Sequence, residues 1–177
     1  MVRKLTSASA NKLLKTLRDR LQLLDSQESA RYIYTEIEGS KPVIPEYDIE
    51  KTNAEIKALM KQIMHLKHAI NVFNTRTEIS SLGMTIDSVL IRMSQLNKLK
   101  DRYDKMRKTE KKVVKTDFAG RSGNKVEYSV ANYDPAIADK YYVELVEEIN
   151  RIQLELDLVN STVTFDYDDE TGMATYQ

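Results

Sequence analysis

The sequence has no cysteine, few glycines and prolines, and no net charge, and each of these absences narrows what the protein can be. Without cysteine, disulfides, cysteine-ligated zinc sites and thiol nucleophiles are excluded, and a reducing compartment fits. Lysine plus arginine and aspartate plus glutamate each number 27, so no overall field favours nucleic acid or an anionic membrane. Five glycines, three prolines and 31% charged residues in 177 residues are typical of long, solvent-exposed helices.

Long apolar runs are also absent. No segment approaches the roughly 18 uncharged apolar residues that a membrane-spanning helix needs. The stretch Met1–Lys15 carries basic residues but lacks the apolar core of a signal peptide. We therefore expect a soluble cytoplasmic protein.

The strongest positive signal is an apolar row over residues 49–73. Its members are spaced alternately by three and four residues, with one polar exception: Ile49, Thr52, Ile56, Leu59, Ile63, Leu66, Ile70 and Phe73. This heptad spacing predicts a helix with one apolar seam, about 37 Å long at ~1.5 Å per residue. Shorter seams of the same kind predict three more helices, over residues 5–30, 86–106 and 135–160.

Local signals set the ends of these helices. Ser7 or Ser9 is expected to cap the first helix, Asp48 the second and Thr85 the third, because a side-chain oxygen can accept from the free N–H groups of a first turn. Gly83 predicts a stop between the second and third helices, and the pair Asp134-Pro135 predicts the start of the last helix.

Two connecting segments have other patterns. Tyr32–Thr35 has strand propensity, but Gly39 and two prolines follow, so a short strand and an irregular connection both remain open. Over residues 113–131, alternating β-branched and aromatic residues flank the turn-forming stretch Ala119–Asn124, which predicts a β-hairpin. Because two strands alone are marginally stable, this hairpin is expected to pack on a helix or to pair with a copy of itself.

These elements predict a mainly α protein of about four long antiparallel helices, with one small β-hairpin inserted before the last helix. The helices over residues 49–73 and 86–106 are expected to form the central hairpin, with the first and last helices packed on it. We expect one domain over residues 1–163. Residues 164–177 form an acidic segment that is expected to be a mobile tail.

A basic stretch over residues 98–121 is the candidate interaction site. Its members are Lys105, Arg107, Lys108, Lys111, Lys112 and Arg121. Clustered cations of this kind can contact phosphates of nucleic acid. The aromatic Tyr103 falls on the apolar face, so no stacking platform stands among the lysines, and a solvated helix face is the competing interpretation.

No catalytic, metal or cofactor site is predicted. His65 and His68 are spaced to share a metal, but their heptad positions lie on the solvent side. The acidic tail lacks the spacing of a calcium loop, because Gly172 comes one place late. The glycine-rich stretch Gly120–Asn124 lacks the Gly-Lys-Ser/Thr of a phosphate-binding loop. We therefore predict a protein that is not an enzyme.

Several short stretches together are similar to one bacterial family of small helical proteins. They are Asn71–Thr77, Gly83–Ile86, Leu90, Arg92–Leu96, Arg121–Glu127 and Asp157–Asn160. The family is known as septicolysin-like or uncharacterised, and the resemblance spans roughly residues 49–163. It implies a helical, coiled-coil-like fold and a bacterial cytoplasmic origin, without an established activity. At Ser161 this sequence departs from the aromatic residue common in the family.

The functional hypothesis is a non-enzymatic helical interaction or scaffold protein. We expect it to form a homo-oligomer through its heptad seams, because apolar stripes that stay uncovered drive association. An unidentified protein partner is the further expectation. The alternatives are nucleic-acid binding through residues 98–121 and membrane damage, as the septicolysin label suggests. The balanced charge and the lack of apolar segments favour neither of them.

Overall fold

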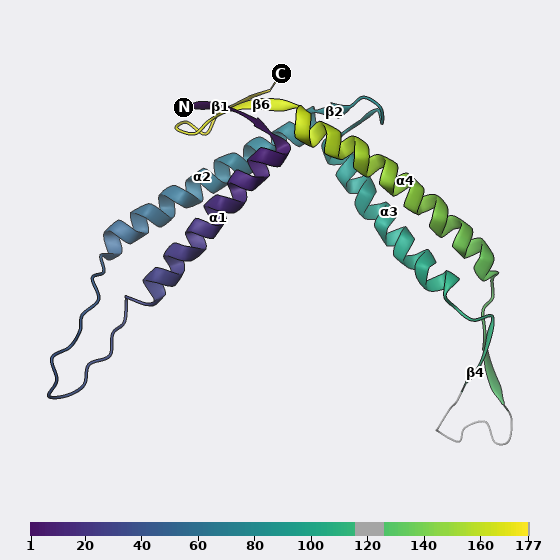
Figure 1. Ribbon diagram of the computed structural model, residues 1–177, viewed down its shortest axis with the longest axis horizontal. Coiled ribbons are helices and arrows are strands. Elements are labelled where there is room, and N and C mark those ends of the chain that lie inside the picture. The colour runs from purple at the N-terminus through teal and green to yellow at the C-terminus, as the bar shows by residue number, and fades with distance from the viewer. Residues whose placement is uncertain (116–125, 177) are drawn as a thin grey trace. The chain divides into compact units, whose positions relative to one another are not determined.

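The computed structural model describes residues 1–115 and 126–176, and it confirms a mainly α protein. The described chain has four helices: α1 (Ser7–Ser29), α2 (Ile49–Arg76), α3 (Ile86–Arg107) and α4 (Pro135–Thr162) (Figure 1). It divides into two compact units, one of residues 1–78 and 157–177 and the other of residues 79–156. This division differs from the single domain expected over residues 1–163.

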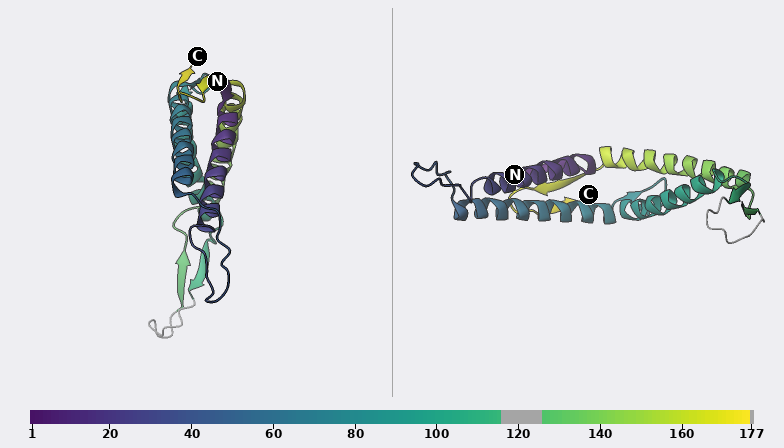
Figure 2. Two further views of the ribbon diagram at one scale, coloured as in Figure 1. Left: turned by 90° about the vertical axis from the view of Figure 1, so that its left-hand side faces the viewer. Right: turned by 90° about the horizontal axis from the view of Figure 1, so that it is seen from below.

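The first unit combines α1 and α2 with a three-stranded antiparallel sheet. The strands are β1 (Val2–Thr6), β6 (Thr164–Asp168) and β7 (Ala174–Tyr176), in the order β1-β6-β7. In the register, Val2 lies opposite Asp168 and Phe165 lies opposite Tyr176. Figures 1 and 2 show α1 and α2 side by side, joined by the segment 30–48.

The sheet of the first unit packs against the helices, and residues of both together form the core of the unit. Leu66, Phe73 and Phe165 are almost fully buried, and the rings of Phe73 and Phe165 lie 5.0 Å apart between centroids. The Tyr176 hydroxyl donates to the carbonyl of Ala69 at 3.1 Å. A mobile tail over residues 164–177 is therefore wrong for the described residues. Its acidic side chains alternate with Phe165 and Tyr167, which are both buried, and this period-two pattern is that of a half-buried strand.

The second unit pairs α3 with the main part of α4. Its buried residues include Ile86, Val89 and Met93 on α3 and Ile152 on α4. The rings of Tyr103 and Tyr141 meet at 5.3 Å across the pair. The remaining strands are β2 (Glu78–Ile79), β3 (Met84–Thr85), β4 (Lys112–Lys115) and β5 (Glu127–Val130).

The helix pairs differ from the expected central hairpin. α2 packs on α1 within the first unit, and α3 and α4 share the second unit, so the predicted pairing of residues 49–73 with 86–106 is not confirmed. A heptad pattern shows which face of a helix is apolar, but several faces of the same kind can serve as its partner. The described chain also has three antiparallel sheets where one hairpin was expected. Of these, β4 and β5 fall within the expected hairpin region, and the turn Ala119–Asn124 lies outside the described residues.

The helix starts follow the local signals closely. Asp48 accepts from the N–H groups of Glu50 and Lys51 at 3.0 Å, and Thr85 accepts from that of Ser88 at 3.3 Å. The Asp134 side chain likewise accepts from the Ala136 N–H at 3.0 Å. These three boundaries are confirmed.

The start of α1 is the exception among the caps. Its N-cap is Thr6, whose hydroxyl accepts from the N–H of Ser9 at 3.1 Å, while the Ser9 hydroxyl accepts from the N–H of Thr6 at 2.9 Å. This reciprocal capping box replaces the expected cap at Ser7 or Ser9. The cap lies at Thr6 because the preceding residues are extended in β1, where Thr6 lies opposite Thr164.

Among the described residues, no helix has an apolar stretch long enough to cross a bilayer.

Candidate functional site

The predicted basic site lies in the second unit, where α3 ends and the chain enters β4. Arg107 is its most constrained member: its Nε donates to Asp104 at 2.9 Å and another nitrogen donates to Asp139 of α4 at 3.1 Å. The guanidinium also lies 4.0 Å from the ring centroid of Tyr142. The hydrogen bonds to Asp104 and Asp139 raise the pKa of Arg107. Arg107 therefore joins α3 to α4.

The neighbouring lysines are engaged as well. Lys108 donates to Asp104 at 2.6 Å, and this bond, together with that from Arg107, lowers the pKa of Asp104. The ammonium of Lys111 donates to the carbonyl of Tyr133 at 2.7 Å. Lys112 lies 4.0 Å from the ring centroid of Tyr128 in β5. Lys108 thus binds within the end of α3, Lys111 joins the base of the hairpin to the segment before α4, and Lys112 contacts the neighbouring strand of its own hairpin.

The other two candidate residues stand apart. Lys105 has no ion pair or side-chain hydrogen bond within the part of the chain that the structure describes. Arg121 lies outside the described residues. The structure thus brings Arg107, Lys108, Lys111 and Lys112 together, each already bound to a group of its own unit.

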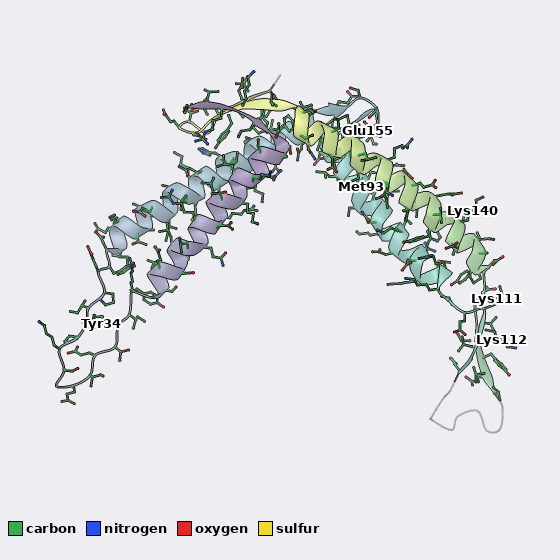
Figure 3. All side chains as sticks on the ribbon, in the orientation of Figure 1. Tyr34, Met93, Lys111, Lys112, Lys140 and Glu155 are labelled. Atoms are coloured by element: carbon green, nitrogen blue, oxygen red, sulfur yellow. The ribbon has the colours of Figure 1, made fainter. Side chains whose placement is uncertain are left out.

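The hairpin that the basic residues support is uncovered on both faces. Every residue of β4 and β5 is exposed, with Val113 at 43%, Val114 at 50% and Val130 at 57%. Val114 pairs with Tyr128 and Lys112 with Val130, so these four side chains share one face. Figure 3 shows Lys111 and Lys112 at the base of this hairpin. An apolar sheet face without cover is a candidate contact surface.

A second uncovered apolar surface occurs in the first unit. The segment 30–48 joins α1 to α2 without regular secondary structure, and its large apolar side chains are between 44% and 89% exposed. They are Tyr32, Ile33, Tyr34, Ile37, Val43 and Ile44. Tyr34 is labelled on this segment in Figure 3. The strand propensity of Tyr32–Thr35 was the available sequence signal, and no strand forms there in this chain.

The end of this segment is fixed to α1. The Tyr47 hydroxyl donates to Glu28 at 2.6 Å, and this hydrogen bond raises the pKa of Tyr47. Beside the bond is a cavity of about 400 Å³, lined by side chains of both signs, among them Arg31, Lys51 and Glu55. Its charged groups do not include a histidine or a paired nucleophile and base.

A smaller cavity in the second unit has the same character. It measures about 280 Å³, and four of its polar side chains form two pairs. Ser81 donates to Glu155 at 2.6 Å, and Arg92 forms an ion pair with Glu148. Glu155 is labelled in Figure 3. The arrangement offers structural hydrogen bonds between α4 and its neighbours.

The two histidines occupy different environments. His68 is exposed as expected, whereas His65 is half-buried because the turn between β6 and β7 covers it. A Cβ atom on Gly172 of that turn would lie 1.9 Å from Nδ1 of His65. The solvent-side position predicted for His65 is therefore wrong. Among the described residues, no group of three or more histidines, aspartates or glutamates is placed to hold a metal ion.

Comparisons with known proteins give one informative match. No protein-family model matches the chain, and no curated protein matches it. A crystal structure of a conserved protein of unknown function from Corynebacterium diphtheriae is similar to it, with a TM-score of 0.66 and 20% sequence identity. The match covers 92% of this chain and 99% of that protein. At this identity the likeness shows a shared fold.

Proposed function

We propose that the chain is a non-enzymatic helical interaction protein that self-associates through surfaces its own units leave uncovered. The observation that carries this proposal is that the apolar residues between α1 and α2 are fully buried only near the sheet of the first unit. Ala10 and Leu14 near the sheet are buried, whereas Leu17, Leu21 and Leu24 further along α1 are only half-buried. Ile56 and Ile63 on the apolar seam of α2 are half-buried too.

The physical reason is the thickness of the unit. Two helices in one layer can cover only one side of each seam, whereas bundles of four cover both sides. The second unit repeats this situation: Leu145 and Ile149 of α4 are half-buried, and Leu99 of α3 is exposed. Further helices, from another chain, would complete both layers.

The exposed apolar side chains of each unit support the same proposal. They lie on the segment 30–48 of the first unit and on the β4–β5 hairpin of the second. Exposed apolar patches larger than those of ordinary monomers mark interaction sites.

A scaffold role rather than catalysis is favoured by the two cavities. The polar groups that line them are paired with one another or of mixed charge, and none is arranged as nucleophile, base and orienting group. The septicolysin-like resemblance, with its helical fold and without an established activity, is compatible with this role and stays a prediction.

Light scattering after size-exclusion chromatography, over a hundredfold range of protein concentration, tests the proposal. We expect a mass that is a multiple of 20.4 kDa at the higher concentrations and dissociation on dilution. A compact monomer whose mass does not change with concentration would refute self-association. The measurement needs no enzymatic assay, because the mass alone distinguishes a monomer from an oligomer.

A further inference from the structure

The segment Tyr32–Ile37 forms no regular secondary structure, and its central residues lack backbone partners. None of the N–H and C=O groups of residues 33–36 hydrogen-bonds to another described residue. Its side chains are apolar, aromatic and β-branched, the types that favour strands, and they are exposed. Unpaired backbone in an exposed strand-forming segment is the usual donor in β-strand addition.

The β4–β5 hairpin has a strand edge that lacks a partner. β4 pairs with β5 along one edge, and within the described residues its other edge pairs with nothing. A free edge presents a row of N–H and C=O groups that another strand can pair with, and two-stranded sheets gain stability from a third strand. β4 is four residues long, a length that the six residues of Tyr32–Ile37 can match.

The charges of the side chains indicate whether the segment would pair with the free edge of β4 or with that of β5. Glu36 is the only charged residue of the segment, and Glu38 follows it in the next turn, whereas β4 carries a lysine on each of its faces, Lys112 and Lys115. β5 instead carries Glu127, which has the same charge as Glu36. Opposite charges on neighbouring strands stabilise a sheet and like charges destabilise it, so the edge of β4 is favoured.

We propose that Tyr32–Ile37 of one copy adds as a third strand to the free edge of β4 in a second copy of this chain. The inference rests on the proposed self-association and names one contact of it. Every copy carries both the unpaired segment and the unpaired edge, so an exchange between copies satisfies each of them. Such a contact is heterologous, and it produces a ring where the rotation closes.

Charge reversal tests the pairing. The variants are Glu36→Lys with Glu38→Lys, and Lys112→Glu with Lys115→Glu, each expected to weaken self-association about tenfold. An equimolar mixture of the two variants should recover association, because each variant then meets the opposite charge. Asp19→Lys and Lys15→Glu, on exposed positions of α1, are the matched controls and should leave the dissociation constant unchanged.

A backbone change tests the strand itself. Tyr34→Pro removes an N–H and blocks strand pairing, so it should weaken association at least as much as the charge reversals. Val43→Pro, in the same segment but outside the proposed strand, is its control. Circular dichroism of each variant verifies that the helices remain.

Cross-linking identifies the partner. A zero-length carboxyl–amine cross-linker applied to a mixture of ¹⁴N- and ¹⁵N-labelled protein should join Glu36 or Glu38 to Lys112 or Lys115 in mixed-isotope peptides. Cross-links only within one label, or cross-links from Glu36 or Glu38 to lysines of the helices in place of those of β4, would overturn the inference. If the protein associates while none of the variants changes the dissociation constant, the strand contact is wrong and the proposed function stands. A monomer at all concentrations would remove both.

Discussion

Strands β6 and β4 each follow a long helix in the chain, and each belongs to an antiparallel sheet. The exposure of their side chains is opposite. In β6, Phe165 and Tyr167 are buried, and Phe165 contacts Phe73 of α2. In β4, every residue is exposed, including Val113 and Val114. β6 has an apolar helix surface beneath it, and β4 does not. The comparison teaches that the first sheet holds its unit together, whereas the second sheet is available for contact.

The largest expected effect comes from the aromatic side chains of the two sheets. Phe165→Ala should lower the free energy of unfolding by about 3–5 kcal/mol, because it leaves a cavity against Phe73. Tyr128→Ala, on the exposed hairpin, should cost less than about 1 kcal/mol. Urea denaturation followed by circular dichroism, at a protein concentration below self-association, measures both. Equal losses would show that the hairpin is as integral to its unit as β6 is.

The turn between β6 and β7 gives the next largest effect. Gly172→Ala should destabilise the protein by about 2 kcal/mol, because residue 172 has φ +73° and the new Cβ would meet the ring of His65. Gly39→Ala has a similar φ of +82° and no atom nearby, so it isolates the cost of the backbone alone.

A double variant separates the two causes at Gly172. His65→Ala removes the ring atoms but keeps the Cβ of residue 65, 2.8 Å from the new Cβ; in this background Gly172→Ala should therefore cost less than in the wild-type protein and still more than Gly39→Ala. If His65→Ala gives no relief, the close approach of the turn to α2 is not what the structure indicates. Thermal unfolding of the four proteins in the cycle provides the measurement.

The helix caps should show smaller and equal effects in the two units. Asp48→Ala removes the cap of α2, and Thr85→Ala removes the cap of α3; each should cost about 1 kcal/mol. Asp48→Asn and Thr85→Ser keep an acceptor and should restore most of the loss. A cap variant without effect on unfolding would show that its helix end is held by other contacts.

The smallest effect expected is a pH dependence in the first sheet. Hydrogen bonds from the amino terminus, the Thr171 hydroxyl and the Glu170 N–H lower the pKa of Asp168 from 3.8 to about 2. A lowered pKa in the folded state contributes stability above the ordinary value, and this stability is lost as pH falls from about 4 to about 2. Asp168→Asn should therefore flatten the dependence of unfolding on pH in this window. An unchanged slope in the variant would contradict the assignment.

Local features of the sequence predicted the helices well. Asp48, Thr85 and Asp134 mark helix starts because a cap depends on neighbours two or three residues away, which the sequence displays directly. Partner choice was not predictable in this way. The seam of residues 49–73 is equally suited to any other apolar seam, and the structure pairs it with α1.

The sheet of the first unit was missed for a related reason. β1 pairs with β6 more than 150 residues away, and only Leu5 is buried in β1, so β1 shows no alternating pattern that would have indicated a partner for β6. At the candidate site, the sequence indicated the cations Arg107 and Lys111. It did not indicate that Asp139 and the carbonyl of Tyr133 bind them, because both partners come from a segment beyond the hairpin.

Hydrogen–deuterium exchange at several protein concentrations tests the central contrast most directly. The account predicts that the amides of β6 are protected equally at every concentration, because their partners lie within the same unit. It predicts that residues 33–37 and the outer edge of β4 exchange rapidly at low concentration and become protected as concentration rises. Exchange that is independent of concentration in both of these segments would contradict the account, as would rapid exchange throughout β6.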